Sequence, residues 1–152
     1  MPSLRPPGVI PLWLVCALAS AASASLVGIF GKIGMAEVDS NLATTIRSVV
    51  MSVFLIGFCT ALGAWSKVPS LHGRAVTMIV LSGLAGAVSW LFYFKAIQLG
   101  QVAQVAPIDK LSMPLAVILA VVILRERFSD VNWVGVALIV VGGYLASLPP
   151  SR

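Results

Sequence analysis

An acid and a base stand side by side between two prolines, in a part of the chain that is otherwise apolar. They are Asp109 and Lys110, and Pro107 and Pro114 flank them. A charged side chain near the centre of a bilayer costs roughly 2.5 to 3.5 kcal/mol on insertion scales, so such groups usually face protein, a partner charge or water. On a continuous helix, neighbours in sequence do not face each other, so each of the two charges needs its own partner. Asp109 is the only acid inside an apolar stretch and is our candidate for proton coupling.

The two prolines are a second reason to look at this segment. Each proline removes a backbone donor and clashes with the preceding turn, and the freed carbonyls must bond to neighbouring helices, Ser112 or water. Broken helices of this kind form binding sites at membrane depth. Prolines are also common as plain kinks. We therefore expect a helix break at Pro107 and Pro114, with a site-forming role and a purely structural role both open.

Three further basic residues fall near the ends of apolar stretches, on the same side as Lys110. They are Lys32, Arg47 and Lys95. Counting at ~1.5 Å per residue puts Lys110 roughly 22 Å from the inner end of its stretch and within about 8 Å of the outer edge. These charges predict an outer cationic vestibule for an anionic or zwitterionic substrate. The alternative is that the long side chains reach lipid headgroups or make structural pairs.

Aromatic residues cluster in the third apolar stretch. Trp90 and Tyr93 stand there with Phe92 and Phe94. One interpretation is that Trp90 and Tyr93 line a binding pocket. The cluster covers several helix faces, however, and an aromatic belt at the outer membrane interface explains it equally well.

The elements that must position these residues are membrane-spanning helices. Of the 152 residues 59% are hydrophobic and only 10% are charged, whereas about a quarter are charged in an average soluble domain. Each of five apolar stretches is close to the ~20 residues needed to cross a bilayer. The predicted spans are 12–31, 45–65, 75–99, 102–124 and 131–148. The fold class is thus all-α, a bundle of five transmembrane helices forming one domain over 12–148, with tails at 1–11 and 149–152.

Several classes of function are excluded by what the chain contains. The net charge of +5 comes from Lys and Arg spread singly, without the basic stripe that nucleic-acid binding requires. No nucleophile triad, paired carboxylates or metal-ligand spacing occurs, so we expect no enzyme activity, no metal and no cofactor. The N-terminal apolar run followed by small residues imitates a signal peptide, but it continues to Phe30, which favours a retained first span.

Small residues follow helical spacing in the first, third and fifth spans. The first has Gly28 and Gly31, the third Gly83 and Gly86, and the fifth Gly143. Residues three and four apart share one helix face, and small side chains there let another backbone approach closely. These faces predict helix packing.

Orientation rests on Lys and Arg, which favour the cytoplasmic side. Five fall on each side of the five predicted spans, Arg5 and Arg152 among them. Setting aside Lys110 and the basic residues at helix ends favours a cytoplasmic N-terminus, and tryptophans 13, 65 and 133 fall at span ends on that side. The weak bias leaves insertion in both orientations open.

The order of several segments resembles the EamA-type domain of the drug/metabolite transporter superfamily. Residues 96–112 read AIQLGQVAQVAPIDKLS, residues 124–129 read LRERFS, and residues 133–143 read WVGVALIVVGG. Residues 30–34, FGKIG, and Ile46-Arg47 resemble the first two helices of the family. The resemblance runs from about residue 12 to residue 148.

The resemblance implies a transporter in the bacterial inner membrane. Family members have ten helices in two five-helix halves of opposite orientation, and this chain is similar to the short members that contain one half. The implied unit is a dimer, an antiparallel homodimer or a heterodimer with another half, moving a small metabolite or drug-like solute by alternating access. Four-helix multidrug exporters of the superfamily carry an acid in the first helix, and this chain has none there. A non-transporting accessory subunit or lipid-carrier flippase component remains the alternative.

Overall fold

The computed structural model describes residues 10–149, and all regular structure in this part of the chain is helical. Its elements are α1 Leu12–Gly34, α2 Ser40–Ala61, the short 3-10 helix η1 Ala64–Ser70, α3 Gly73–Leu99, α4 Val102–Asp109, α5 Ser112–Ile123 and α6 Asp130–Ser147. Five spans in this range are long and apolar enough to cross a membrane, with α4 and α5 together forming the fourth. The predicted all-helical fold with five spans is confirmed. Arg5 and Arg152, which entered the charge count, lie outside the described residues.

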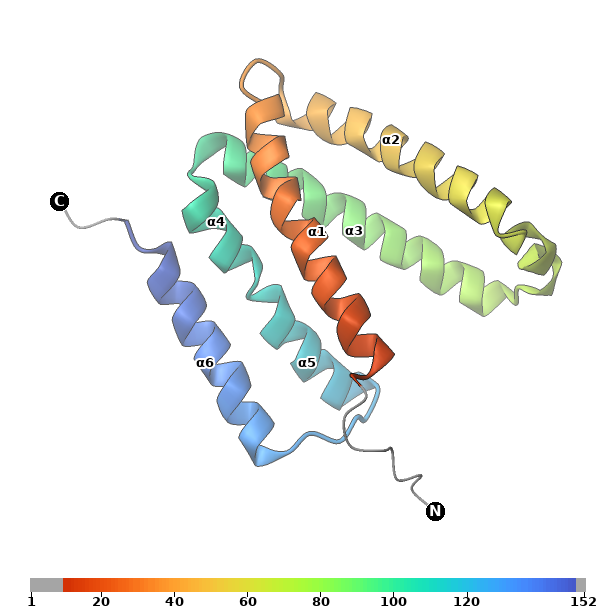
Figure 1. Ribbon diagram of the computed structural model, residues 1–152. Coiled ribbons are helices and arrows are strands. Elements are labelled where there is room, and N and C mark those ends of the chain that lie inside the picture. Colours follow the sequence, from red (N-terminus) through yellow and green to blue (C-terminus); the bar gives the residue numbers. More distant parts are fainter. Residues whose placement is uncertain (1–9, 150–152) are drawn as a thin grey trace.

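The helices form two pairs joined through α1. Helix α2 packs along α3, α4 packs along α6, and α1 contacts both α3 and α4. Figure 1 shows the α1–α2 loop and the α3–α4 turn at one end of the bundle, while α2 and α3 lean away from α1 toward the opposite end. The bundle is therefore closed at one end and opens between α1 and α2.

The small residues of two spans lie where helices approach closely, as predicted. A Cβ atom at Gly143 of α6 would lie 3.2 Å from the carbonyl oxygen of Pro107, and one at Gly28 of α1 would lie 2.7 Å from the Tyr93 hydroxyl. In contrast, Gly83 and Gly86 of α3 have nothing within 4 Å of the Cβ position. The small face of the third span is open in the single chain.

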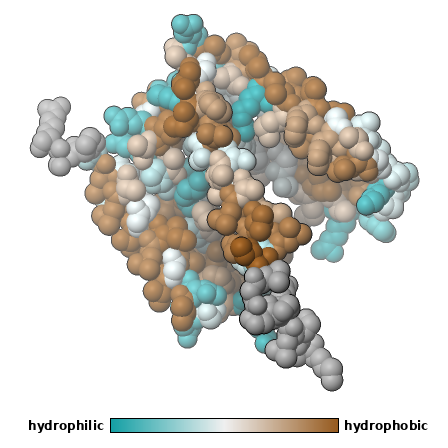
Figure 2. Space-filling view, in the orientation of Figure 1, coloured by the Kyte–Doolittle hydropathy of each residue, from teal (hydrophilic) through white to brown (hydrophobic). Residues whose placement is uncertain are grey.

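The buried core is small and lies at the closed end. Its buried apolar residues are Met35, Phe94 and Ile97. Most other large apolar side chains in the described range are exposed, and Figure 2 shows hydrophobic residues over much of the visible face. Such a surface suits lipid, because lipid tails are as apolar as the side chains and leave little hydrophobic force to bury them.

Helix α2 begins five residues earlier than the predicted second span. Asp39 precedes it as an N-cap, and its Oδ1 accepts hydrogen bonds from the backbone N–H of Asn41 at 2.8 Å and of Leu42 at 3.4 Å. The bond from Asn41 chiefly holds the pKa of Asp39 below its ordinary value; burial opposes it, and Leu42 N–H and the charge of Lys95 add to it. We missed this start because Asp39 looked like an ordinary loop acid.

The other end of α2 also differs from the prediction. Gly63 has a φ of 62°, a left-handed conformation that glycine adopts without steric cost, and α2 ends just before it at Ala61. Trp65, expected at the end of the second span, therefore lies in η1. Its Nε1 donates to Thr60 Oγ1 at 2.9 Å, which folds η1 back against the end of α2.

The fourth span is interrupted between its two prolines. Pro107 lies in the last turn of α4. Pro114 lies in the first turn of α5, where a missing N–H does little harm. The carbonyl of Lys110, which Pro114 deprives of its usual donor, accepts from Met113 N–H at 3.0 Å. Our expectation that Ser112, a neighbouring helix or water would be needed is thus wrong at this carbonyl, because a tighter local turn satisfies it.

Lys32 ties α1 to the turn between α3 and α4. Its Nζ donates to the carbonyl oxygens of Ile97 at 2.6 Å, Gly100 at 2.9 Å and Gln98 at 3.4 Å. The last carbonyls of a helix lack intrahelical donors and carry partial negative charge, so an ammonium group there is stabilising. The contacts of this lysine are those of a structural pair between α1 and the α3–α4 turn.

Replacing Lys32 with Met should destabilise the bundle. The change removes a charged donor from three carbonyls, which we expect to cost about 1 to 2 kcal/mol. Thermal unfolding in detergent, followed by circular dichroism, should show a lower midpoint for Lys32→Met. Lys67→Met, at an exposed lysine of η1, is the matched control. Equal midpoints for the two variants would contradict the tether.

Asp39 should stabilise α2 in a pH-dependent way. Because its folded pKa is depressed, its contribution is present above the unfolded pKa of about 3.9 and is lost as the pH falls through the folded pKa. Asp39→Ala should therefore lower the unfolding midpoint at pH 7, and its difference from the unmodified chain should shrink below about pH 4. Asp39→Asn keeps a capping oxygen without titrating. A deficit of Asp39→Ala that stays constant with pH would contradict the assignment.

Candidate functional site

The break between α4 and α5 holds the two charges of the fourth span. Helix α4 ends at Asp109, and Lys110 begins the connecting turn. Lys110 Nζ lies 3.6 Å from Asp109 Oδ2. The expectation that each charge would need its own partner is therefore wrong. It assumed a continuous helix, and the turn at the break lets adjacent side chains meet.

The pair lies deeper than counting along its own span indicated. A cavity of about 180 Å³ is lined by both residues together with Ala24 of α1 and Ser89 of α3. Ala24 is just past the midpoint of α1, and Ser89 is ten residues before Leu99, about 15 Å from that helix end at 1.5 Å per residue. Relative to its neighbours, the pair lies near the middle of the bundle rather than in its outer third. The count was made from the inner end of the span, whereas Lys110 is eight residues, about 12 Å along a helix, past the outer end at Val102.

Tyr93 lines two of the cavities that Asp109 also lines. These are the 180 Å³ cavity and a second cavity of about 520 Å³. The Tyr93 ring meets Trp90 edge to face, with centroids 6.2 Å apart, and Phe94 likewise at 5.7 Å. An acid and a phenol thus face shared space beside an aromatic wall formed by Trp90, Tyr93 and Phe94.

The aromatic wall divides the predicted cluster of the third span. Phe94 is buried, and its ring lies against Gly31 of α1. A Cβ atom added at this glycine would collide with the ring. Phe92 is 72% exposed, yet it also lines the 520 Å³ cavity beside Tyr93. The pocket interpretation therefore fits Trp90, Tyr93 and the inner edge of Phe92, while most of the Phe92 ring is open to the surroundings of the chain.

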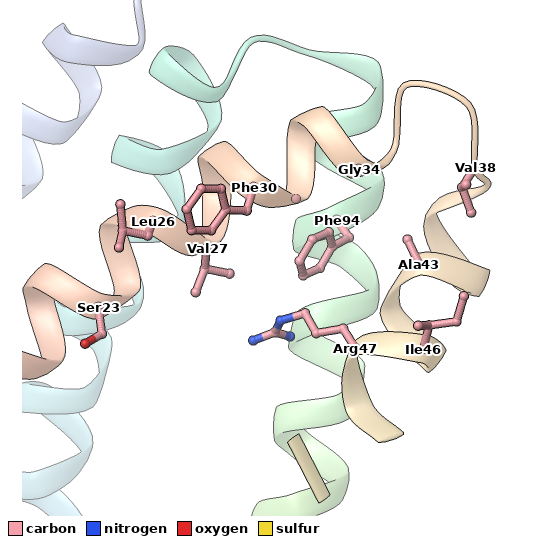
Figure 3. A pocket seen from close by; sticks show the side chains of 11 residues that line it. Ser23, Leu26, Val27, Phe30, Gly34, Val38, Ala43, Ile46, Arg47 and Phe94 are labelled. Carbon is pink, nitrogen blue, oxygen red and sulfur yellow. The ribbon is translucent and has the colours of Figure 1, made fainter. Parts of the chain in front are cut away.

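Arg47 belongs to a different cavity on the other side of the wall. Its guanidinium carbon lies 3.3 Å from the centroid of the Trp90 ring and 5.2 Å from that of Phe94. Figure 3 shows the side chain extending from α2 toward α1 into a pocket of about 580 Å³. This pocket, the α1–α2 cleft, is lined mainly by apolar residues. We did not predict two of them, Leu26 and Phe30, although their spacing of four residues put both on one face of α1.

The predicted cationic vestibule is not a single group of charges. Lys32 is bound to backbone carbonyls, and Lys110 is paired with its own neighbour. Lys95 is exposed on α3, where its Nζ lies 3.2 Å from Gln98 Oε1. Arg47 alone extends into the cleft. The structure thus gives two candidate sites, Asp109–Lys110 with Tyr93 and Arg47 with Trp90. Trp90 adjoins both, because it also lines the 180 Å³ cavity that contains the ion pair.

Among residues 10–149, no three side chains of the types that bind metals come together. The acids in this range are spread over loops and helix ends, and Asp109 is the one that lies in the middle of a membrane span. What the arrangement offers is ionisable and aromatic groups facing cavities inside an apolar bundle. These groups suit binding and proton movement.

Comparisons with known proteins identify the family of the chain. The model of the EamA-like transporter family matches residues 11–148. The chain is 43% identical over 136 residues to a protein of Sinorhizobium sp named "Uncharacterized transporter in cobO 3'region", an alignment that covers 90% of this chain and 96% of that relative. No solved structure matches. Because the family match includes all five spans, the chain belongs to the EamA-like transporter family of multi-pass membrane proteins.

Proposed function

We propose that this membrane transporter moves a small metabolite or drug-like solute by alternating access, with its movement coupled to protons at Asp109. The observation that carries the proposal is the Asp109–Lys110 pair at a break halfway along the bundle. Ionisable groups at such depth are costly and usually mark substrate or proton paths, and broken helices near the midplane are common at transporter binding sites.

The ion pair suggests how protonation and conformation are linked. With Asp109 ionised, its charge holds the Lys110 ammonium at 3.6 Å. Protonation of Asp109 removes this attraction and frees Lys110 to bind another group or solvent. A proton shifts a conformational equilibrium only as far as it binds the two states differently. Release of Lys110 at the junction between α4 and α5 would supply that difference.

The functional unit we propose contains two five-helix halves. In a single chain the cavities beside Asp109 are open, and the small face of α3 at Gly83 and Gly86 has no partner. Small residues on a membrane helix favour close helix association. The aligned relative is covered almost completely, so a chain of this length recurs there. A second copy in antiparallel orientation, or another half, would complete the substrate path.

The location we propose is the bacterial inner membrane. In one orientation the N-terminus is cytoplasmic, which places Lys67, Arg74, Arg125 and Arg127 on the side that favours positive charge. Trp13 and Trp133 lie at the beginnings of α1 and α6 on the same side. An antiparallel homodimer requires the opposite orientation as well.

Replacing Asp109 with Asn should abolish proton coupling while leaving the fold intact. Proteoliposomes containing the pH dye pyranine would be exposed to a mixture of amino acids, organic acids and amines, and solute-dependent proton movement recorded. We expect movement with the unmodified chain and none with Asp109→Asn. Glu37→Gln, at an exposed acid in the α1–α2 loop, is the matched control and should behave as the unmodified chain. Solute-dependent movement that persists in Asp109→Asn would exclude this acid as the proton carrier.

The two proposed orientations can be measured directly. A reporter pair fused after Arg152, one active in the cytoplasm and one in the periplasm, should give comparable signals on both sides. Fusions after Arg152 in a variant with extra lysines in the α1–α2 loop should become one-sided, because added positive charge fixes topology. A one-sided signal from the unmodified chain would rule out the antiparallel homodimer and leave pairing with a different half.

A further inference from the structure

Arg47 is a cation without a counter-charge inside the membrane-spanning part of the chain. It lies seven residues after the start of α2, about 10 Å along the helix. Within residues 10–149 the one ion pair joins Lys110 to Asp109, and no hydrogen bond is formed by the Arg47 guanidinium. A charge at this depth normally has a partner of opposite sign. Arg47 therefore lacks the group that would balance it.

The Trp90 ring fixes how Arg47 presents its donors. The guanidinium carbon lies 3.3 Å from the ring centroid, a distance at which the planar cation is in contact with the aromatic face. The contact covers one face of the guanidinium and leaves its N–H edge free. That edge is a rigid fork that matches the two oxygens of a carboxylate. The missing partner is thus best supplied by a planar anion with two oxygens.

The cleft defines the rest of the ligand. Its volume of about 580 Å³ is in the range of small-molecule sites. Leu26 and Phe30 of α1 and Ile46 of α2 give it apolar walls, and Ser23 adds one hydroxyl. No carboxylate is among its lining residues, so nothing there would hold an amino group as a salt bridge. These walls suit an apolar body attached to a single negative charge.

We propose that the α1–α2 cleft binds an amphipathic organic carboxylate, with its carboxylate on the N–H edge of Arg47 and its apolar body against Leu26 and Phe30. This inference rests on the proposed transport function and names its class of substrate. It assigns the anion to the Arg47 side of the aromatic wall and leaves Asp109 on the other side for the proton. Substrate and proton then bind to separate faces of one wall made of Trp90, Tyr93 and Phe94.

Three probes that differ in one group test the proposal. The purified chain in phosphatidylcholine nanodiscs would be titrated by calorimetry with 3-phenylpropionate, 3-phenylpropanamide and 3-phenylpropylamine. We expect the carboxylate to bind and the amide and amine to bind at least about ten-fold more weakly, because only the carboxylate forms a charge-assisted, two-point pair with Arg47. Equal affinity for the carboxylate and the amide would overturn the proposal.

Variants assign the binding to Arg47. Arg47→Gln should remove the preference for the carboxylate, and Arg47→Lys should weaken it because lysine keeps the charge but loses the planar fork. Arg74→Gln, in the first turn of α3, is the matched control and should bind as the unmodified chain. If Arg47→Gln fails to fold, Trp90→Phe is used in its place. Phenylalanine keeps an aromatic ring against the guanidinium but holds the cation more weakly, so carboxylate binding should weaken. The assignment would be overturned if Arg47→Lys kept the full preference for the carboxylate and Arg47→Gln, or Trp90→Phe in its place, kept it as well.

A lipid headgroup or a helix of a second copy could instead occupy the cleft. Repeating the titration in nanodiscs that contain phosphatidylglycerol tests for a lipid headgroup. Loss of 3-phenylpropionate binding there would identify the cleft as a lipid site and contradict the proposal that it binds a soluble carboxylate. Absence of binding to the dimer, with binding to the monomer, would identify the second copy as the occupant and also contradict it. The titration uses no gradient. Binding without transport would therefore refute only the transport function, and transport without carboxylate binding would refute only this inference.

Discussion

The interaction on which the arrangement depends is the contact of the Lys32 ammonium with the carbonyls at the end of α3. Lipid supplies almost no hydrophobic force between helices, so polar contacts and close packing must fix their positions. The buried core of Met35, Phe94 and Ile97 lies at this same end. The α1–α2 loop and the turn between α3 and α4 are thus held together at this closed end.

The aromatic wall is the second element that organises the bundle, because it keeps two charged sites apart. Arg47 stacks on Trp90, while Tyr93 lines the cavities that contain Asp109. Direct contact between the arginine and the acid would neutralise both and leave neither charge for a ligand. Separation by rings maintains an unbalanced cation on one side and a self-contained ion pair on the other.

Sequence patterns predicted the features that depend on local composition and missed those that depend on contacts between distant segments. Span number followed from the lengths of apolar stretches, and the position of the break followed from Pro107 and Pro114. The start of α2 was missed because an N-cap such as Asp39 differs from a loop acid only in its backbone geometry. The contacts of Lys32 and Arg47 were unpredictable for a related reason. The sequence around a basic residue near a helix end does not indicate whether backbone carbonyls, an aromatic ring or lipid will contact it. The depth of Asp109 in the bundle became apparent only from the residues of α1 and α3 that line the same cavity.

Gly28 and Gly31 have a mechanical consequence for how the molecule moves. The Tyr93 hydroxyl occupies the space of a side chain at Gly28, and the Phe94 ring occupies that at Gly31, about one helical turn away. Rotation of α1 about its own axis would drive these aromatic groups into larger neighbouring side chains, so α1 and α3 must travel as one rigid block. Helix α2 packs along α3 and therefore belongs to the same block. The remaining joint is the two-residue connection between α4 and α5, which contains Lys110 itself. The partner charge of Asp109 thus lies at the interruption about which the fourth span can bend.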